Sequence, residues 1–223
     1  MSSADHRIRS RAVALTVFLL CTVTTVVAGQ SSWSYFGGDR AFTRYAPLDQ
    51  IDASNVDRLE VVWRRPGADP SYREAYEDLG VPGYLRSTPI VVDGVVYAPN
   101  GIGLVEAFDP GTGETLWLQQ PFEPSIEEVR GRSTKGIDAW SSGEEDYLVV
   151  VREPFLYVLD RRTGAYVPSF GDDGRVLLTP DGAGDDNYRA SSGPIVVGDV
   201  VVVAGIVGAA GDSGDQKEAT PED

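Results

Sequence analysis

The 223-residue chain carries a formal net charge of −15, with 34 acidic and 19 basic side chains. Its hydrophobic content of 42% is enough to build a packed core, which excludes a chain that is disordered throughout. The acidic balance argues against a nucleic-acid partner, because binding to phosphates needs clustered Lys and Arg. The sequence shows no metal-binding cluster, nucleophile–base pair or phosphate-binding glycine loop.

Residues 1–28 are typical of a secretory signal. Three arginines precede an uncharged, mostly apolar run over 12–27, and the run ends in small residues suited to cleavage after Ala28. Cleavage would place the mature chain in the periplasm or outside the cell. An uncleaved membrane anchor is the alternative, because the apolar run is just short of a membrane-spanning length. We favour cleavage.

An N-terminal segment follows over residues 29–65. Glycines and a proline indicate an ordered loop from Trp33 onward, and a short helical turn is expected to begin at 54–56. Residues 59–64 alternate between apolar and polar side chains, which predicts a strand carrying Trp63. This strand has no hairpin partner of its own, so we expect it to complete a sheet built elsewhere.

The next segments alternate between loops and hairpins. Residues 65–87 and 120–146 are polar and are predicted to be loops, the first with a turn of helix near 72–79. A unit of four short strands is predicted over 88–119, with a type I′ turn at Asp93-Gly94. The remaining predicted strands lie at 147–151, at 155–160 and in a pair over 192–205, whose Gly198-Asp199 turn suits type II′.

Two sets of landmarks repeat at nearly the same period. Asp109 precedes Thr112-Gly113, and the same arrangement returns 51 residues later at Asp160 and Thr163-Gly164. Pro89 and Pro194 open two similar strand pairs 105 residues apart, which is two such periods. A period near 50 built from strands points to propeller blades. Residues 66–223 are therefore expected to form an incomplete propeller of about two and a half blades, in which the strand at 59–64 completes the last blade. We expect the chain to be the front part of a longer protein.

The motifs resemble those of the pyrroloquinoline quinone (PQQ) dependent alcohol and sugar dehydrogenases. Residues 38–48 and 55–63 are similar to the N-terminal signature of that family. Residues 107–117 are similar to its blade-docking motif, in which tryptophans tie neighbouring blades together. Residues 164–174 resemble the membrane-bound glucose dehydrogenase branch most. The resemblance extends over residues 33 to about 210.

The resemblance implies an all-β, eight-bladed propeller with PQQ and Ca²⁺ on its axis. It also implies the N-terminal part of a periplasmic enzyme that oxidises an alcohol or a sugar by hydride transfer to the quinone. A cytochrome c or a membrane quinone would accept the electrons. The catalytic aspartate and further calcium ligands are expected beyond Asp223, so the chain is expected to be inactive alone. The oligomeric state is left open.

Three residues are carried over as cofactor-binding candidates. Arg86 stands where the family has a glutamate, Lys135 where it has an arginine, and Ser191 where it has a hydroxyl before the third blade. The glutamate that binds calcium in the family falls near Ala209, with Asp212 the nearest carboxylate, so the metal ligands are left open. Arg86 and Lys135 as solvated loop charges and Ser191 as a turn hydroxyl remain the alternative. A propeller with PQQ-like repeats that serves as a non-enzymatic, protein-binding scaffold of the cell envelope is the alternative function.

Overall fold

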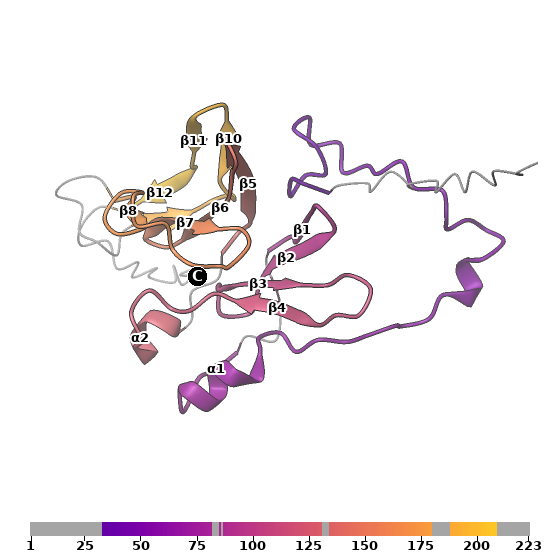
Figure 1. Cartoon of the computed structure of the whole chain (residues 1–223), viewed down its shortest axis with the longest axis horizontal. Coiled ribbons are helices and arrows are strands. Elements are labelled where there is room, and N and C mark those ends of the chain that lie inside the picture. The colour runs from indigo at the N-terminus through magenta and orange to yellow at the C-terminus, as the bar shows by residue number, and fades with distance from the viewer. Residues whose placement is uncertain (1–32, 82–84, 86, 131–133, 180–187, 209–223) are drawn as a thin grey trace, which may run out of the picture.

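The computed structural model describes residues 33–81, 85, 87–130, 134–179 and 188–208, and the expected signal segment lies outside them. The regular secondary structure of the described part is mostly β (Figure 1). Its helical elements are η1 (Val56–Arg58), α1 (Pro70–Ala75) and α2 (Ile126–Val129). Its strands are β1 (Ile90–Val92), β2 (Val95–Pro99), β3 (Val105–Phe108), β4 (Thr115–Leu118), β5 (Ile137–Ser142), β6 (Glu145–Arg152), β7 (Phe155–Asp160), β8 (Arg175–Leu177), β9 (Tyr188–Ala190), β10 (Ile195–Val197), β11 (Val200–Val202) and β12 (Gly205–Val207).

The first sheet has the order β1-β2-β3-β4 and is antiparallel throughout. This confirms the predicted unit over 88–119. Asp93 and Gly94, between β1 and β2, have φ angles of 50° and 77°, as the predicted type I′ turn requires. The helical turns predicted near 56 and 72 are also present, as η1 and α1.

The second sheet has the order β5-β6-β7-β8 and repeats the arrangement of the first. It contains the predicted hairpin as β6 and β7. The prediction of a loop over 120–146 is wrong, because that range holds both α2 and β5. Strand β5 is missed because a strand is predicted from alternating apolar and polar residues, and a charged residue, Asp138, is fully buried in this one. Hydrogen bonds from other segments satisfy the Asp138 carboxylate.

A third group of strands contains the hairpin β10-β11 and the pair β12-β9. The hairpin matches the strand pair predicted over 192–205, and Gly198 has the positive φ (59°) of a type II′ turn. Strand β9 begins at Tyr188, before the predicted start of this unit.

The segment 59–64 is not a strand in the described structure. It runs extended, without a ladder partner among the described residues, and Val61 and Val62 are 64% and 80% exposed. The strand prediction is therefore wrong for the described residues. The segment is anchored instead by Trp63 and Arg65, whose side chains contact the first sheet.

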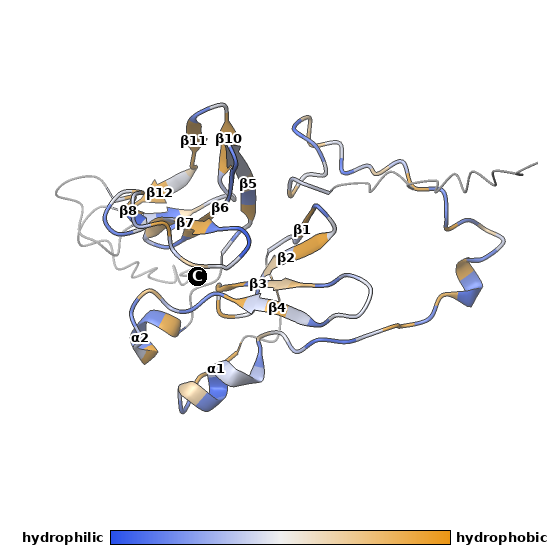
Figure 2. Cartoon of the chain, in the orientation of Figure 1, coloured by the Kyte–Doolittle hydropathy of each residue, from blue (hydrophilic) through white to orange (hydrophobic). Residues whose placement is uncertain are grey.

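The sheets pack face to face around a common edge. One core cluster lies between the first and second sheets, and another joins the second sheet to the third group. The leading strands β1, β5 and β10 are neighbours, with β5 between the other two. Apolar residues gather on the strands, and most connecting segments are hydrophilic (Figure 2). No helix among the described residues has the length and apolar character needed to cross a bilayer.

Candidate functional site

The two Asp-x-x-Thr-Gly turns have the same geometry. Asp109 Oδ1 accepts hydrogen bonds from the backbone N–H groups of Gly111 (2.8 Å) and Thr112 (2.7 Å) and from the Thr112 hydroxyl (3.1 Å). Asp160 Oδ1 accepts the equivalent set from Arg162 and Thr163, at 2.9 to 3.0 Å. The 51-residue repeat read from the sequence is therefore a structural repeat.

Tryptophans join each turn to the preceding segment. Trp117 Nε1 donates to the carbonyl of Arg161 at 3.1 Å, and a Cβ added to Gly164 would clash with its ring. Trp63 repeats this arrangement with the carbonyl of Pro110 (2.8 Å) and with Gly113. The predicted docking role of Trp117 is confirmed, and Trp63 occupies the equivalent place on the first sheet.

The three cofactor-binding candidates precede the three leading strands. Arg86 lies outside the described residues. Lys135 is half-buried just before β5, and it forms no ion pair or hydrogen bond with any residue that the structure describes. Ser191 is exposed before β10, and its backbone N–H donates to the carbonyl of Ala204 at 2.9 Å.

The structure brings the loops of Lys135 and Ser191 together. A Cβ on Gly193 would lie 3.1 Å from Cα of Gly136, so the two backbones meet next to the candidate residues. A side chain at position 193 would push against the backbone of Gly136, because Cβ contacts this short are rare, whereas a Cβ at position 136 would make an ordinary contact at 3.6 Å. The two segments therefore meet at Gly136 and Gly193, and the cofactor-binding roles of Lys135 and Ser191 stay predictions.

Ser87 is a site residue that sequence reasoning did not single out. Its Oγ is buried, and it has no hydrogen-bond partner in the described structure. Pro89 and Pro194 are equivalent in the repeat, so Ser87 corresponds to Ser192 and the candidate Arg86 corresponds to Ser191. The repeat therefore holds no signal that singles out Ser87. A buried hydroxyl without a partner is costly, so it marks a place where an acceptor is missing.

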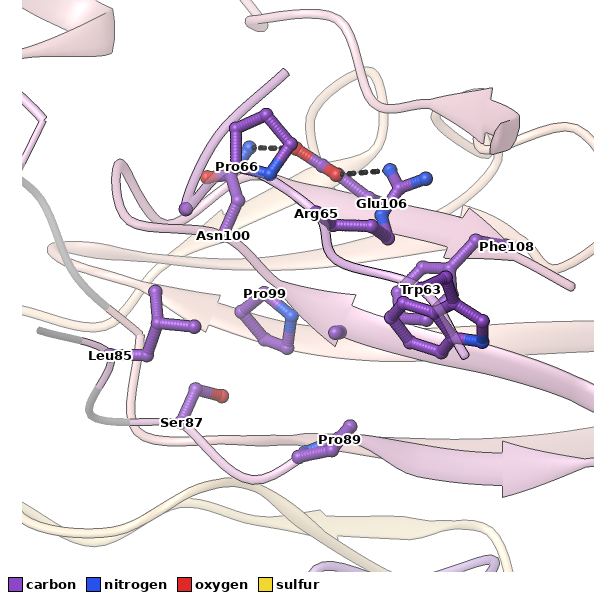
Figure 3. A pocket seen from close by; sticks show the side chains of 12 residues that line it. Trp63, Arg65, Pro66, Leu85, Ser87, Pro89, Pro99, Asn100, Glu106 and Phe108 are labelled. Atoms are coloured by element: carbon purple, nitrogen blue, oxygen red, sulfur yellow. Dashed lines mark hydrogen bonds and ion pairs between the residues drawn. The ribbon is translucent and has the colours of Figure 1, made fainter. Parts of the chain in front are cut away.

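Ser87 also lines a cavity of about 260 Å³ on the first sheet. Figure 3 shows the apolar part of the lining, which includes Trp63, Phe108 and Leu85. At its polar end Arg65 Nη2 lies 2.8 Å from Glu106 Oε2, and Glu106 Oε1 accepts from Asn100 Nδ2 at 3.0 Å (Figure 3). These charges satisfy one another, so the described lining of the cavity offers no free charged group for catalysis.

PQQ carries three carboxylates, and two described residues that precede leading strands are donors of the kind that carboxylates need. Among the described residues, the Lys135 ammonium group has no ionic partner and the Ser87 hydroxyl has no acceptor. Calcium is a different case. The described residues contain no group of three or more His, Cys, Asp or Glu side chains that could hold a metal, and Ala209 and Asp212 lie outside them.

Comparison with known proteins gives consistent results. The PQQ family model, described as glucose/ethanol/alcohol dehydrogenase, beta-propeller domain, matches residues 33–220. The chain is 32% identical over 191 residues to 1-butanol dehydrogenase (cytochrome c) of Thauera butanivorans, covering 83% of this chain and 24% of that protein. It is 36% identical over 93 residues to the dehydrogenase subunit of the quinone alcohol dehydrogenase of Gluconacetobacter polyoxogenes, covering 42% of this chain and 11% of that protein.

The fold comparison agrees. The structure is similar to quinohemoprotein alcohol dehydrogenase ADHIIG of Pseudomonas putida HK5, with a TM-score of 0.54 and 23% identity over 78% of this chain and 23% of that one. The chain thus spans about a quarter, or less, of the length of these relatives. Its all-β fold, a partial propeller of the quinoprotein dehydrogenase type, is confirmed. The chain belongs to the PQQ family of glucose, ethanol and alcohol dehydrogenase β-propeller domains.

Proposed function

We propose that this chain is the N-terminal part of a PQQ-dependent dehydrogenase that oxidises a hydroxyl group of an alcohol or a sugar. The family match over residues 33–220 carries the proposal. The names of the relatives favour an alcohol, since they include 1-butanol dehydrogenase (cytochrome c) and several quinone alcohol dehydrogenases. Quinoprotein glucose dehydrogenase A of Acinetobacter calcoaceticus, 27% identical over 200 residues, keeps a sugar among the proposed substrates.

The chain's own residues would contribute binding. Lys135 would pair with a carboxylate of the cofactor through a charge-assisted hydrogen bond, and Ser87 and Ser191 would donate hydroxyl hydrogen bonds. Bound PQQ would supply a hydride acceptor for the hydroxyl-bearing carbon of the substrate, and the hydroxyl proton would pass to the catalytic aspartate expected beyond Asp223. Calcium belongs to the proposal as a Lewis acid whose ligands come from outside the described residues. A cytochrome c or a membrane quinone is proposed as electron acceptor, and the periplasm as the location.

Reconstitution tests the proposal. The full-length gene product is incubated with PQQ and Ca²⁺, and dye reduction is followed with primary alcohols and aldoses. We expect turnover with at least one class of substrate, and PQQ that stays bound through gel filtration. If the product shows no turnover and retains no PQQ, the enzyme is rejected and the scaffold alternative is favoured. The isolated 223-residue chain is expected to give no turnover, because its described sheets do not close around an axis.

A further inference from the structure

Asp138 is a fully buried carboxylate that receives hydrogen bonds from three separate segments. Its Oδ2 accepts from Arg40 Nη1 at 2.6 Å and from the backbone N–H of Val196 at 2.7 Å. Its Oδ1 accepts from Arg40 Nη2 at 3.2 Å and from its neighbour Ala139 N–H at 2.9 Å. A carboxylate without exposed side-chain surface is tolerated only when its oxygens are satisfied in this way.

These bonds tie together the leading strands of two adjacent units and the N-terminal segment. Asp138 lies on β5, Val196 on β10, and Arg40 is 98 residues from Asp138 in sequence. The Arg40 guanidinium also covers the ring of Tyr35, 4.6 Å from its centroid, which limits its freedom although half of its side chain is exposed. The carbonyl of Trp33 accepts from Val91 N–H at 2.9 Å. The segment 33–40 therefore contacts β1 and β5, and Asp138 links it to β10.

The hydrogen-bonded residues Asp138 and Val196 lie close in sequence to two of the cofactor-binding candidates. Lys135 lies three residues before Asp138, and Ser191 lies five residues before Val196. Gly136, between Lys135 and Asp138, is in backbone contact with Gly193, between Ser191 and Val196. The two loops are thus joined at two successive points: a contact of glycines and the hydrogen bond from Val196 to Asp138.

We propose that the Arg40–Asp138 pair is a positioning device that fixes the spacing of the loops carrying Lys135 and Ser191. The segment 33–40 then supports the site from outside the sheets. The effect on PQQ affinity rests on the proposed function, whereas the effect on the loops does not. Mutation of residues that orient the ligand-binding residues without touching the ligand commonly lowers ligand affinity by about tenfold or more.

Hydrogen exchange in the 223-residue chain tests the effect on the loops. Asp138→Asn is expected to raise amide exchange about tenfold or more in peptides covering 134–137 and 191–196, and to leave β6 and β7 unchanged. Asp146→Asn is the matched control: it removes the same charge from an arginine pair, with Arg161 at 2.7 Å, on the same sheet. Unchanged exchange in both loops of Asp138→Asn would overturn the proposal.

If Asp138→Asn raises exchange throughout the second sheet, Arg40 variants provide the test instead. Arg40→Met is expected to raise exchange in the two loops alone, and Arg40→Lys to restore most of the protection because it keeps a charged donor. Loops unaffected by Arg40→Met would reject the pair as a positioning device. This series does not depend on any cofactor.

PQQ titration of the full-length product tests the consequence for the site. Asp138→Asn and Arg40→Met are expected to bind PQQ about tenfold more weakly, with Arg40→Lys intermediate and Asp146→Asn unchanged. Failure of the wild type to bind PQQ rejects the proposed function, and the exchange data still decide the effect on the loops. Equal PQQ affinity in variants with loosened loops would reject the role in the site.

Discussion

The indole of Trp117 lies against Gly164, and its Nε1 donates to the carbonyl of Arg161 at 3.1 Å. Gly164 has a φ of +73°, which glycine adopts without strain. The same relationship joins Trp63 to Gly113. Contact between successive units thus depends on one large side chain, one backbone carbonyl and one glycine that leaves room for the ring.

Gly164→Ala is expected to lower the free energy of unfolding by about 3 kcal/mol. The alanine would have to adopt a left-handed φ, and its Cβ would displace the Trp117 ring. Gly143→Ala is the matched control. Gly143 has a similar φ of +63°, but no atom of the described residues lies within 4 Å of the position its added methyl would take, so about 1 kcal/mol is expected. Urea unfolding measures both. Equal losses in the two variants would show that the tryptophan contact contributes nothing.

Arg65→Met is expected to destabilise the chain by about 3 kcal/mol, since it leaves the Glu106 carboxylate buried without its cation. Only 5% of the Glu106 side chain is exposed. The control is Arg162→Met, which removes a pair at 3.8 Å from an arginine that is 83% exposed, and which is expected to cost less than about 0.5 kcal/mol. Urea unfolding of Arg65→Met, Glu106→Gln and the double variant gives the coupling energy. A coupling near zero would contradict the assignment.

Stability is expected to fall as the pH drops below 4. Hydrogen bonds from the Thr112 backbone N–H and then from its hydroxyl lower the pKa of Asp109 below the ordinary value of 3.8. The Ser141 hydroxyl, followed by Arg161, lowers the pKa of Asp146. A lowered folded-state pKa contributes stability above the unfolded-state pKa, and this stability is lost as the pH falls through the folded-state value.

Unfolding midpoints measured between pH 7 and pH 2.5 check this expectation. Asp109→Asn is expected to give a shallower fall than the wild type, because the variant has no carboxylate to protonate at the turn. Asp199→Asn removes a carboxylate of an exposed turn that, within the described structure, lacks the three hydrogen bonds of Asp109, and it is expected to retain the wild-type slope. Identical slopes in all three proteins would contradict the prediction.

The parts of the fold that the sequence predicts are those specified locally. The turns at Asp109 and Asp160 and the hairpin at Asp93-Gly94 follow from neighbouring residues, so their sequence repeats at a visible period. Strand β5 escapes prediction because the burial of Asp138 depends on Arg40, 98 residues away. The strand expected at 59–64 fails for a related reason: a strand requires a ladder partner, and none is present among the described residues.

The candidate site is predictable in part. Resemblance to the family selects the loops before β5 and β10, which the structure brings into contact through Gly136 and Gly193. Composition cannot show that, within the described part of the chain, Lys135 lacks an ionic partner and the Ser87 hydroxyl lacks an acceptor, since both are properties of the packed chain. The cofactor-binding roles of Arg86, Lys135 and Ser191 stay predictions.

Lys135→Met is expected to weaken PQQ binding to the full-length product by about tenfold to a hundredfold, the usual range for a lost charge-assisted hydrogen bond. Lys135→Arg is expected to bind at least as tightly as the wild type, because a guanidinium restores a two-point contact with a carboxylate. Fluorescence titration gives the dissociation constants. Arg73→Met, on the exposed side of α1, removes one positive charge elsewhere and should have no effect. A Lys135→Met protein with wild-type affinity would show that Lys135 is only a solvated loop charge.

Ser87→Ala is expected to weaken PQQ binding without destabilising the free protein. In the free chain it removes a buried hydroxyl that has no partner among the described residues, so the free energy of unfolding should stay the same or rise by about 1 kcal/mol. In the full-length product the same change should weaken PQQ binding several-fold, because one donor to the cofactor is lost. Ser191→Ala is the comparison, since its hydroxyl is solvated in the free chain and its removal should not stabilise. Urea unfolding without PQQ and titration with PQQ separate the two effects. A Ser87→Ala chain that is clearly destabilised when free would show that the hydroxyl already has a partner within the fold.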